Sequence, residues 1–518
     1  MNKTSQTVIQ PLLSKGLQYY LYLTAAMTGA AIMVVEILGA KMLSPYVGTS
    51  HFVWTAQIAV TLLALSTGYY AGGRMADRSQ NLTGLYTAIL SAAACLVVTV
   101  LIRERVANWC LDFNLAVGSL LASGILFFAP LALLAMTGPF LVRVITSSVA
   151  GVGGSVGRLT AIGTLGSFMG TICIGYVMLP RLLNSVSMYL TAAALALVCI
   201  GYFVVFSRHS PAALAGTVIL LATACTLAWF NPSHRFVHLK ELFRGNSNFG
   251  LIQVLEREDG SLRLYANDRL FQNTYDPARK QSTSTFTYAL AGLARAYTTN
   301  INDVLCIGMG IGIVPMEFAR SGVRVDVVEI NPAVVPIAER FFDFEPDKVH
   351  LSIDDGRHFL NCCEKQYDAV LLDAFLGDSS PSHLMTHEAF ASIKRVLRPG
   401  GVLVINAFCD VQEGRDFFGA SLAKTLKSVF PGLRLHGDEG QIYLVATDHP
   451  EPSFVHKPEL DHVHPFVRLK TALAFANVVT TTADHGRVLR DDFNPVEYFD
   501  AHNRENIRRR LALGARDW

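Results

Sequence analysis

The stretch VLCIGMGIGIVPMEFARSGVRVDVVEIN, residues Val304–Asn331, contains a complete strand, turn, helix and strand pattern. The apolar run Val304–Ile307 is typical of a buried parallel strand, and three glycines follow it at once, at 308, 310 and 312. Val314–Arg320 then reads as a helix, and a second strand, Val325–Ile330, carries Glu329 near its tip. This pattern predicts a nucleotide-binding βαβ unit, in which the glycines let the backbone approach a ligand.

Two kinds of ligand fit this unit equally well. One is a dinucleotide, and the other is an S-adenosylmethionine-type molecule, whose adenosine is bound by the same geometry. GMGIG lacks the GxGxxG spacing because position 313 is Ile, and Glu329 lies 17 residues after Gly312. Both ligands tolerate that spacing, so the segment alone leaves the choice open.

The composition divides the 518-residue chain into two halves. Hydrophobic residues make up 51% of it and the mean hydropathy is +0.35, and the apolar excess lies before residue 232. The net charge of +2 argues neither for nor against an anionic partner, and we expect no nucleic-acid partner. The nine cysteines contain no CxxC pair, so we read them as reduced thiols.

The first half predicts a transmembrane domain over residues 17–231, after a polar N-terminal tail over residues 1–16. About seven apolar runs are long enough to cross a bilayer: 17–40, 53–73, 83–102, 116–142, 159–180, 187–207 and 212–231. Pro130 and Pro139 predict a kink or a re-entrant turn in the fourth run. Gly166 and Gly170 form a GxxxG pair, which favours close helix packing over a substrate path.

Glu36 lies inside the first run, where a carboxylate normally has a partner or a function. Arg143 is a candidate partner, and a substrate or proton role is the alternative. We expect an integral protein of a bacterial-type inner membrane, with the lipid bilayer as a partner and the catalytic half in the cytoplasm. The positive charges oppose that orientation, since Arg74, Arg78 and Arg158 would then lie outside.

The second half predicts a small β-subdomain with a connecting helix (232–300), a Rossmann-like α/β domain of the class I methyltransferase type (301–450) and a C-terminal extension (451–518). Strands are expected in Phe249–Asn273, with a hairpin turn at Asp259-Gly260. Alternating segments continue the α/β domain: strand 349–353, helix 357–362, strand 369–372, helix 389–397, turn 398–401, strand 402–406 and a closing antiparallel pair near Arg434 and 441–446.

Acids follow three of the predicted parallel strands, where such sheets bind their ligands. Glu329 suits the hydroxyls of a ribose, and Asp355 with a neighbouring backbone amide suits an adenine amino group. Asp373 then points to where a reacting group would lie. Any one of these acids alone is better explained as a helix cap, but all of them together favour an adenosyl-sulfonium site.

Residues 247–450 resemble the spermidine synthase family of polyamine aminopropyltransferases. The resemblance rests on DRLFQNTYDP, VLCIGMGIG, VVEINP, IDDGRHFL, YDAVLLDAF and LRPGGVLVIN. The spans, with TGYYAGGRMADR, and the C-terminal VLRDDFNPVEYF resemble the membrane-fused branch of that family. The resemblance implies a membrane-bound alkyl transferase that moves an aminopropyl-type group from an S-adenosyl sulfonium donor to a small amine. It leaves a homodimer open.

The resemblance also implies roles for individual residues. Glu329 would hold the ribose, Asp355 and Gly356 would meet the adenine, and Gln272 would touch the donor or its thioether product, beside the three glycines. Asp373 would be the catalytic base or orienting acid near the amine, and Tyr288 would line the acceptor channel.

Two departures from the family pattern affect the transferred group. Soluble members carry an Asp in the glycine loop, where this chain has Ile311. They also carry DSSDP after the fourth strand, where this chain reads DAFLGDSSP, so that the second acid is Asp378 or is lost. Both acids handle cationic groups, which leaves decarboxylated and intact S-adenosylmethionine as alternative co-substrates.

The chemistry needs a carboxylate within hydrogen-bond reach of the attacking amine, and Asp373 fits this role. Asp276, Asp378, Asp491 and Asp492 are further acids for the acceptor side, each better explained as a solvated loop residue. His383 and His387 fit a gate over the site or, as ordinary residues, a loop and a helix start. We expect no metal, because two histidines without further ligands make no site.

Three hypotheses follow. The first is aminopropyl transfer to an amine. The second is S-adenosylmethionine-dependent methyl transfer to a lipid or hydrophobic amine, which Ile311 favours. The third is a transporter or sensor regulated by a nucleoside, against which Asp373 argues, because a binding module does not need it.

Overall fold

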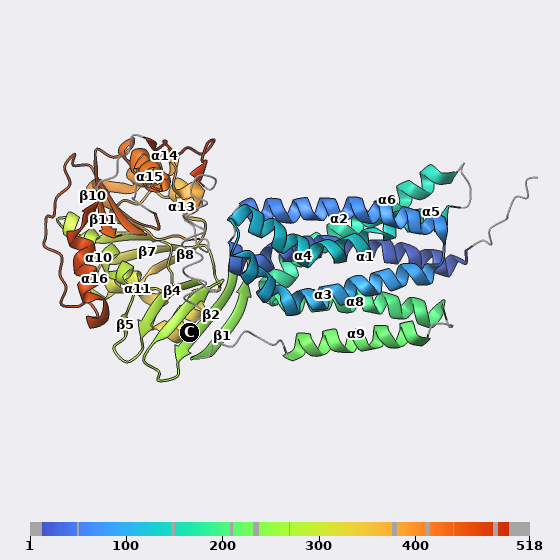
Figure 1. Ribbon diagram of the computed structural model, residues 1–518. Helices are drawn as coiled ribbons and strands as arrows, with labels where there is room; N and C mark the ends of the chain where they lie inside the picture. Colours follow the sequence, from blue (N-terminus) through green and yellow to red (C-terminus); the bar gives the residue numbers. More distant parts are fainter. Residues whose placement is uncertain are drawn as a thin grey trace, which may run out of the picture. The chain divides into compact units, whose positions relative to one another are not determined.

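The structure is a computed structural model, and it describes residues 13–48, 51–146, 151–207, 211–230, 238–268, 270–375, 381–409, 415–438, 440–479 and 485–496. The chain divides into two compact units, Met1–His234 and Arg235–Trp518 (Figure 1). The first is helical and the second contains two β-sheets with their helices. Each unit is described by itself.

The helical unit contains α1 (Lys15–Val47), α2 (His51–Arg78), α3 (Leu82–Cys110), α4 (Leu115–Ala135), α5 (Thr137–Ile145), α6 (Val152–Ile172), the π-helical turn η2 (Cys173–Met178), α7 (Leu179–Arg181), α8 (Asn184–Val205) and α9 (Pro211–Phe230). In the described part of this unit, seven helical stretches are long and apolar enough to cross a membrane, if α4–α5 and α6–η2–α7 each count as one. This conclusion rests on length and composition alone.

Two glycines allow α6 to approach α1 closely. Gly166 and Gly170 of α6 lie against the backbone of Ala26 and Ala30 in α1, so closely that a Cβ on either glycine would collide with it. This contact confirms the packing role predicted for the GxxxG pair.

The fourth apolar run is interrupted, as its prolines predicted. α4 ends at Ala135 and α5 begins at Thr137, with Pro130 inside α4. Arg143 in α5 lies 3.7 Å from Asp77, and both side chains are more than half exposed. The expected pairing of Arg143 with Glu36 is therefore wrong, because Arg143 pairs with the end of α2 instead.

The second unit begins with an antiparallel sheet whose strands follow one another in sequence order: β1 (Leu239–Ser247), β2 (Gly250–Arg257), β3 (Arg263–Asn267), β4 (Leu270–Asp276) and β5 (Gln281–Ser282). Asp259-Gly260 forms the predicted turn between β2 and β3, where Ser261 N donates to Asp259 Oδ1 and Gly260 has a φ of 68°. Helix α10 (Thr285–Tyr297) then leads to the larger sheet.

The larger sheet has eight strands in the order β13-β11-β12-β10-β9-β6-β7-β8. Its strands are β6 (Asp303–Ile307), β7 (Arg324–Glu329), β8 (His350–Ile353), β9 (Tyr367–Leu372), β10 (Leu397–Ala407), β11 (Gly432–Asp438), β12 (Gln441–Thr447) and β13 (Val478–Val479). β8, β7, β6, β9 and β10 are parallel, and β12 is antiparallel to β10 and β11. The predicted Rossmann-like sheet and its closing antiparallel pair are confirmed.

Helices cover both faces of this sheet. The helices α11 (Ile313–Arg320), α12 (Val335–Phe342) and α16 (Pro465–Ala476), with α10, share one apolar core with it. The helices α13 (Gly356–Cys362), α14 (His387–Val396) and α15 (Phe417–Lys427) share the other. Residues 398–401, expected to form a turn, instead belong to β10. There the pairing of β10 with β9 shifts in register between Leu397 and Val402. The C-terminal extension supplies α16 and β13 to this same layer structure.

Candidate active site

The glycine loop after β6 adopts a backbone that only glycine accepts readily. Gly308, Gly310 and Gly312 have φ values of 93°, 53° and 83°. A Cβ at Gly308 would collide with the carbonyl oxygen of Asp373, and a Cβ at Gly312 would collide with the ring of Phe344. The loop therefore lies directly against the end of β9, and it opens the N-terminus of α11.

Ile311, in the middle of this loop, faces the protein interior. It is 1% exposed and belongs to the apolar core under α11 and α12. It does not line the cavity that the loop borders. The loop thus contributes backbone and no side-chain charge at this position.

Glu329, at the end of β7, is 9% exposed and held by the backbone. Its Oε2 accepts from Met309 N at 3.0 Å and its Oε1 accepts from Asn331 N at 2.8 Å. Burial raises the pKa of Glu329, and the backbone NH groups of Asn331 and Met309 oppose that rise. Each carboxylate oxygen keeps a further lone pair that can accept from a hydroxyl group in the cavity.

Asp355 combines two roles. Its Oδ1 accepts from Arg357 N and His358 N and so caps α13, as the simpler interpretation predicted. Its Oδ2 lies 3.0 Å from His383 Nε2. Burial raises the pKa of Asp355, but hydrogen bonds from His358 N and His383 outweigh it and lower the pKa overall. The side chain is thus ordered from both sides at the cavity wall.

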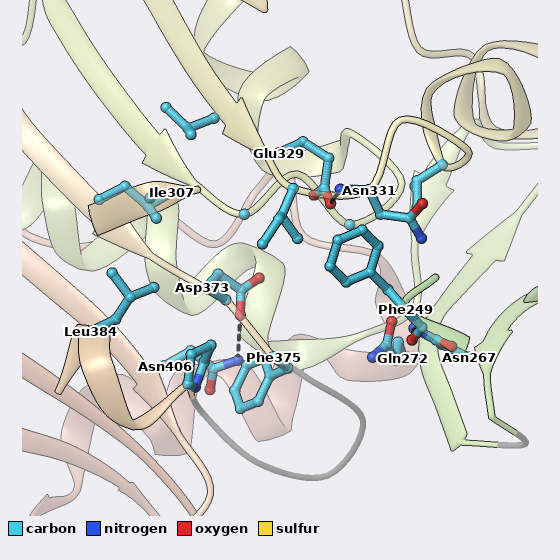
Figure 2. Close-up of a pocket in the computed structure, with 18 of the residues that line it drawn as sticks. Phe249, Asn267, Gln272, Ile307, Glu329, Asn331, Asp373, Phe375, Leu384 and Asn406 are labelled. Carbon is cyan, nitrogen blue, oxygen red and sulfur yellow. Dashed lines mark hydrogen bonds between the residues drawn. The ribbon is translucent and has the colours of Figure 1, made fainter. Parts of the chain in front are cut away.

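Asp373, directly after β9, is oriented by its neighbour in the sheet. Asn406 Nδ2, at the end of β10, donates to Asp373 Oδ1 at 2.9 Å (Figure 2). Gln441 Nε2 in turn donates to Asn406 Oδ1 at 3.1 Å, which fixes the direction of the amide. Burial raises the pKa of Asp373 to about 6, although the Asn406 hydrogen bond lowers it. Such a carboxylate is ionised at neutral pH and still basic enough to accept a proton.

These strand ends and the small sheet together enclose a cavity of about 220 Å³. Figure 2 shows Phe249 and Gln272 from the small sheet on one side of this space, opposite Asp373 and Asn406. Among the lining residues, the sequence predicted seven: Gln272, Gly308, Gly310, Glu329, Asp355, Gly356 and Asp373. Five phenylalanines add apolar surface: Phe249, Phe271, Phe286, Phe375 and Phe408. An apolar enclosure with a few converging polar groups is typical of a small-molecule site.

Comparison with known proteins assigns this region to a family. Residues 284–434 match the model of the spermine/spermidine synthase domain. The C-terminal unit contains a spermidine synthase domain.

Several curated proteins are similar to the chain over this domain. A probable polyamine aminopropyl transferase of Bifidobacterium longum (strain NCC 2705) is 26% identical over 231 residues, 44% of this chain and 50% of that protein. The polyamine aminopropyltransferase of Vibrio vulnificus (strain CMCP6) is 40% identical over 127 residues, 23% of this chain and 41% of that protein. An N-terminal histidine N-methyltransferase of Emericella nidulans is 33% identical over 140 residues, 26% of this chain and 24% of that protein. The chain thus spans half or less of each relative.

Other predicted residues do not line the cavity. Gly312 is the N-cap residue of α11. Tyr288 is 5% exposed, and its hydroxyl donates to the carbonyl oxygen of Ser282 at 2.8 Å. Asp276 Oδ1 accepts from two backbone NH groups of its own turn, and its Oδ2 lies 3.2 Å from His464. Asp378 lies outside the described residues.

The remaining acids and histidines also have local partners. Asp491 accepts from Thr386 Oγ1 and from Arg357, 2.6 and 2.9 Å away, and Asp492 is exposed. His387 Nδ1 lies 2.8 Å from Ser428 Oγ at the start of α14. Among the described residues, no group of three His, Cys, Asp or Glu side chains could hold a metal ion.

Two residues of the cavity wall, Asn406 and Phe249, were not predicted from the sequence, and a third, His383, was predicted only as one of two alternatives. Asn406 stands at the carboxyl end of the fifth parallel strand, so the rule that identified Glu329 and Asp373 would have found it too. His383 was predicted either as part of a gate over the site or as an ordinary loop residue, and its contact with Asp355 at the cavity wall agrees with a place beside the site. Phe249 comes from a turn of the small sheet, and no local signal linked it to the cavity.

Proposed function

We propose that this protein is a membrane-bound spermidine synthase-like transferase. It moves an aminopropyl-type group from an S-adenosyl sulfonium donor to the nitrogen of a small amine, with Asp373 as the base. The observation that carries the proposal is the partly buried Asp373 carboxylate, with a pKa of about 6, in the same cavity as Glu329 and the glycine loop. The names of the aminopropyltransferase relatives support it.

The donor site is built from three strand ends. The backbone at Gly308 and Gly310 leaves room for the donor beside β6, and Glu329 offers free lone pairs to the two ribose hydroxyls. Asp355 Oδ2 and the start of α13 meet the adenine, with His383 holding the carboxylate in place. When bound, the donor supplies a carbon activated by its positive sulfur.

Asp373 removes the proton that blocks the reaction. A protonated amine has no free lone pair, so it must lose a proton before the nitrogen attacks. The nitrogen lone pair then forms the new C–N bond while the C–S bond breaks, and that electron pair leaves on sulfur as a neutral thioether. Asp373 accepts a proton from the nitrogen, and until it does so its negative charge stabilises the positive charge on the amine.

Orientation of the reactants supplies much of the rate. The Gln441–Asn406–Asp373 chain fixes one carboxylate oxygen and leaves the other for the amine. The phenylalanines of the wall make the surroundings of the carboxylate less polar than water, which strengthens its attraction for the cationic amine.

Methyl transfer from intact S-adenosylmethionine is the second candidate. Ile311 is buried, so the glycine loop offers no carboxylate to a cationic aminopropyl chain. The similarity to an N-terminal histidine N-methyltransferase favours the same alternative.

The seven apolar helical stretches support the bilayer as the location, with the synthase domain on the cytoplasmic side, where soluble metabolites are available.

The sulfur-containing product separates these functions. Purified full-length protein is incubated with decarboxylated or intact S-adenosylmethionine and a panel of amines, and the nucleoside product is identified by mass spectrometry. Methylthioadenosine is expected. S-adenosylhomocysteine would instead establish methyl transfer, and tight donor binding without either product would favour a nucleoside-regulated transporter. Asp373→Asn should abolish turnover, whereas Asp276→Asn, outside the cavity, should not.

A further inference from the structure

A buried amide in the helical unit has no hydrogen-bond partner among the described residues. Gln57 of α2 is 0% exposed, and in that part of the chain neither its Oε1 nor its Nε2 has a partner. The amide lies flat against Gly39 of α1, where a Cβ would come within 2.6–2.8 Å of its Nε2, Cδ and Oε1. Gly39 therefore leaves the space that the Gln57 amide fills. An unpaired amide in an apolar interior costs about 1–3 kcal/mol, so a bound group is expected to satisfy it.

A carboxylate lies one helical turn away. Glu36 precedes Gly39 by three residues, and positions three apart lie on the same side of a helix. Glu36 is half-buried, and in the described part of the chain it has no hydrogen-bond or ion-pair partner. Arg143, the partner expected from the sequence, pairs with Asp77.

The π-helical turn η2 directly follows α6, the helix that packs against α1. Ala26 and Ala30 of α1 face Gly166 and Gly170 of α6, so the two helices run parallel in a fixed register. Continued along both helices, that register places Glu36 level with Tyr176, inside η2 (Cys173–Met178). Single π-helical turns occur often at functional sites, because they interrupt the regular helix geometry.

We propose that Glu36 and Gln57 form a second binding site, within the helical unit, for a protonated primary amine. A primary ammonium group has three N–H donors, and the two oxygens of Glu36 with Oε1 of Gln57 supply three acceptors. The carboxylate also neutralises the charge, which a membrane interior requires. A bare metal ion fits less well, because hard cations such as Ca²⁺ take 6–8 oxygen ligands.

This site gives the helical unit a role toward the same chemical class that the synthase domain is proposed to use. The inference rests on the proposed membrane location and amine substrate, but it needs no turnover. Its test therefore uses the Asp373→Asn variant of the full-length protein, so that failure of catalysis and failure of this site remain distinguishable.

Dicyclohexylcarbodiimide, an apolar reagent that modifies protonated carboxyl groups, reports on Glu36 directly. The protein in detergent is treated with it in the presence or absence of 1,4-diaminobutane, and the modified and unmodified Glu36 peptides are quantified by mass spectrometry. We expect Glu36 to be modified, and a saturating diamine to slow modification by about tenfold or more, since only the free site reacts. Tetramethylammonium, which has the charge but no N–H group, should not protect.

Two variants locate the protection at Gln57. Gln57→Leu removes the amide, and Gly39→Ala expels it from its place; both should leave Glu36 reactive and abolish protection by the diamine. Gly73→Ala is the matched control, because that α2 glycine has open space around it. The proposal is overturned if Glu36 does not react, if tetramethylammonium protects equally, or if Gln57→Leu retains protection.

Discussion

Asn406 Nδ2 donates a hydrogen bond of 2.9 Å to Asp373 Oδ1, and the two residues belong to neighbouring parallel strands. The two residues stand at the carboxyl ends of β10 and β9, and Gln441 holds the donor amide from a third strand. The orientation of the proposed base is therefore a property of the sheet itself, and it does not depend on a surface loop.

Replacement of Asp373 should separate activity from stability. Asp373→Asn keeps the shape and the Asn406 contact, and loss of the base should lower kcat by about 10²–10⁴, with donor affinity nearly unchanged. The buried carboxyl binds its proton more tightly in the folded protein, so its contribution to stability is complete below about pH 4 and is lost as the pH rises through 6. The variant should thus be more stable than wild type at pH 8, by about 1–3 kcal/mol, but not at pH 4.

Denaturant unfolding at both pH values, with isothermal titration for the donor, measures these effects. A variant that loses stability at pH 8, or that binds donor much more weakly, would show that Asp373 is mainly structural.

The pH dependence of turnover should report the same carboxyl group. Below about pH 6, kcat/KM should fall about tenfold per pH unit, because Asp373 becomes protonated. The Asn406 hydrogen bond lowers that pKa, so Asn406→Leu should move the midpoint upward by about one pH unit. Gln441→Leu should move it less, in the same direction. Asp276→Asn is the control. A midpoint that Asn406→Leu leaves in place argues against Asp373 as the titrating group.

Glu329 should determine donor affinity and hardly affect the chemical step. Glu329→Gln keeps one acceptor oxygen but replaces the other with a donor, which should weaken donor binding by about 10–100-fold, from lost hydrogen bonds to a charged group. Methylthioadenosine binding, followed by titration calorimetry, measures this loss. Glu345→Gln, on the exposed segment after α12, should bind normally. Unchanged affinity in Glu329→Gln would remove Glu329 from the donor site.

Alanine substitution at two glycines with the same backbone φ should distinguish the cost of backbone strain from the cost of a steric collision. Gly312 and Gly322 both have a φ of 83°, but only Gly312 has a ring, that of Phe344, where a Cβ would lie. Gly322→Ala should cost about 1 kcal/mol through backbone strain alone, and Gly312→Ala about 1–3 kcal/mol more through overpacking. Chemical denaturation of both variants provides the comparison, and equal losses would mean that Phe344 moves aside freely.

The sequence predicted the parallel sheet and the strand-end acids because both follow from local patterns. An apolar run followed by glycines, such as Val304–Gly308, needs no distant contact to be recognised. The same rule located Glu329 and Asp373. Phe249, which reaches the cavity from a turn of the small sheet, could not be found, since only the folded chain brings it there. The direction of the Ile311 side chain could not be predicted either, because a residue in a ligand-binding loop can still face the protein core.

Gln272 lines the cavity and Tyr288 does not, although both were predicted to belong to the site. Both come from the segment before the Rossmann-like sheet, and both were assigned through family resemblance. Gln272 lies in an antiparallel strand at the cavity, whereas Tyr288 points to α16 and its preceding loop, where it packs with Val463 and Val467. Successive positions of a helix are rotated by about 100° around its axis, so a small alignment error moves a side chain out of the site.

The short strand β13 bears on how this polypeptide can be cut for separate study. Val478–Val479 covers the outer edge of β11, and Phe475 of the preceding helix lies against Gly292 of α10. A fragment that stopped at residue 450 would expose the unpaired edge of β11 and a large apolar face, both of which promote aggregation. A soluble fragment should therefore retain residues 235–496, and its yield and solubility should fall sharply when the tail after residue 450 is removed.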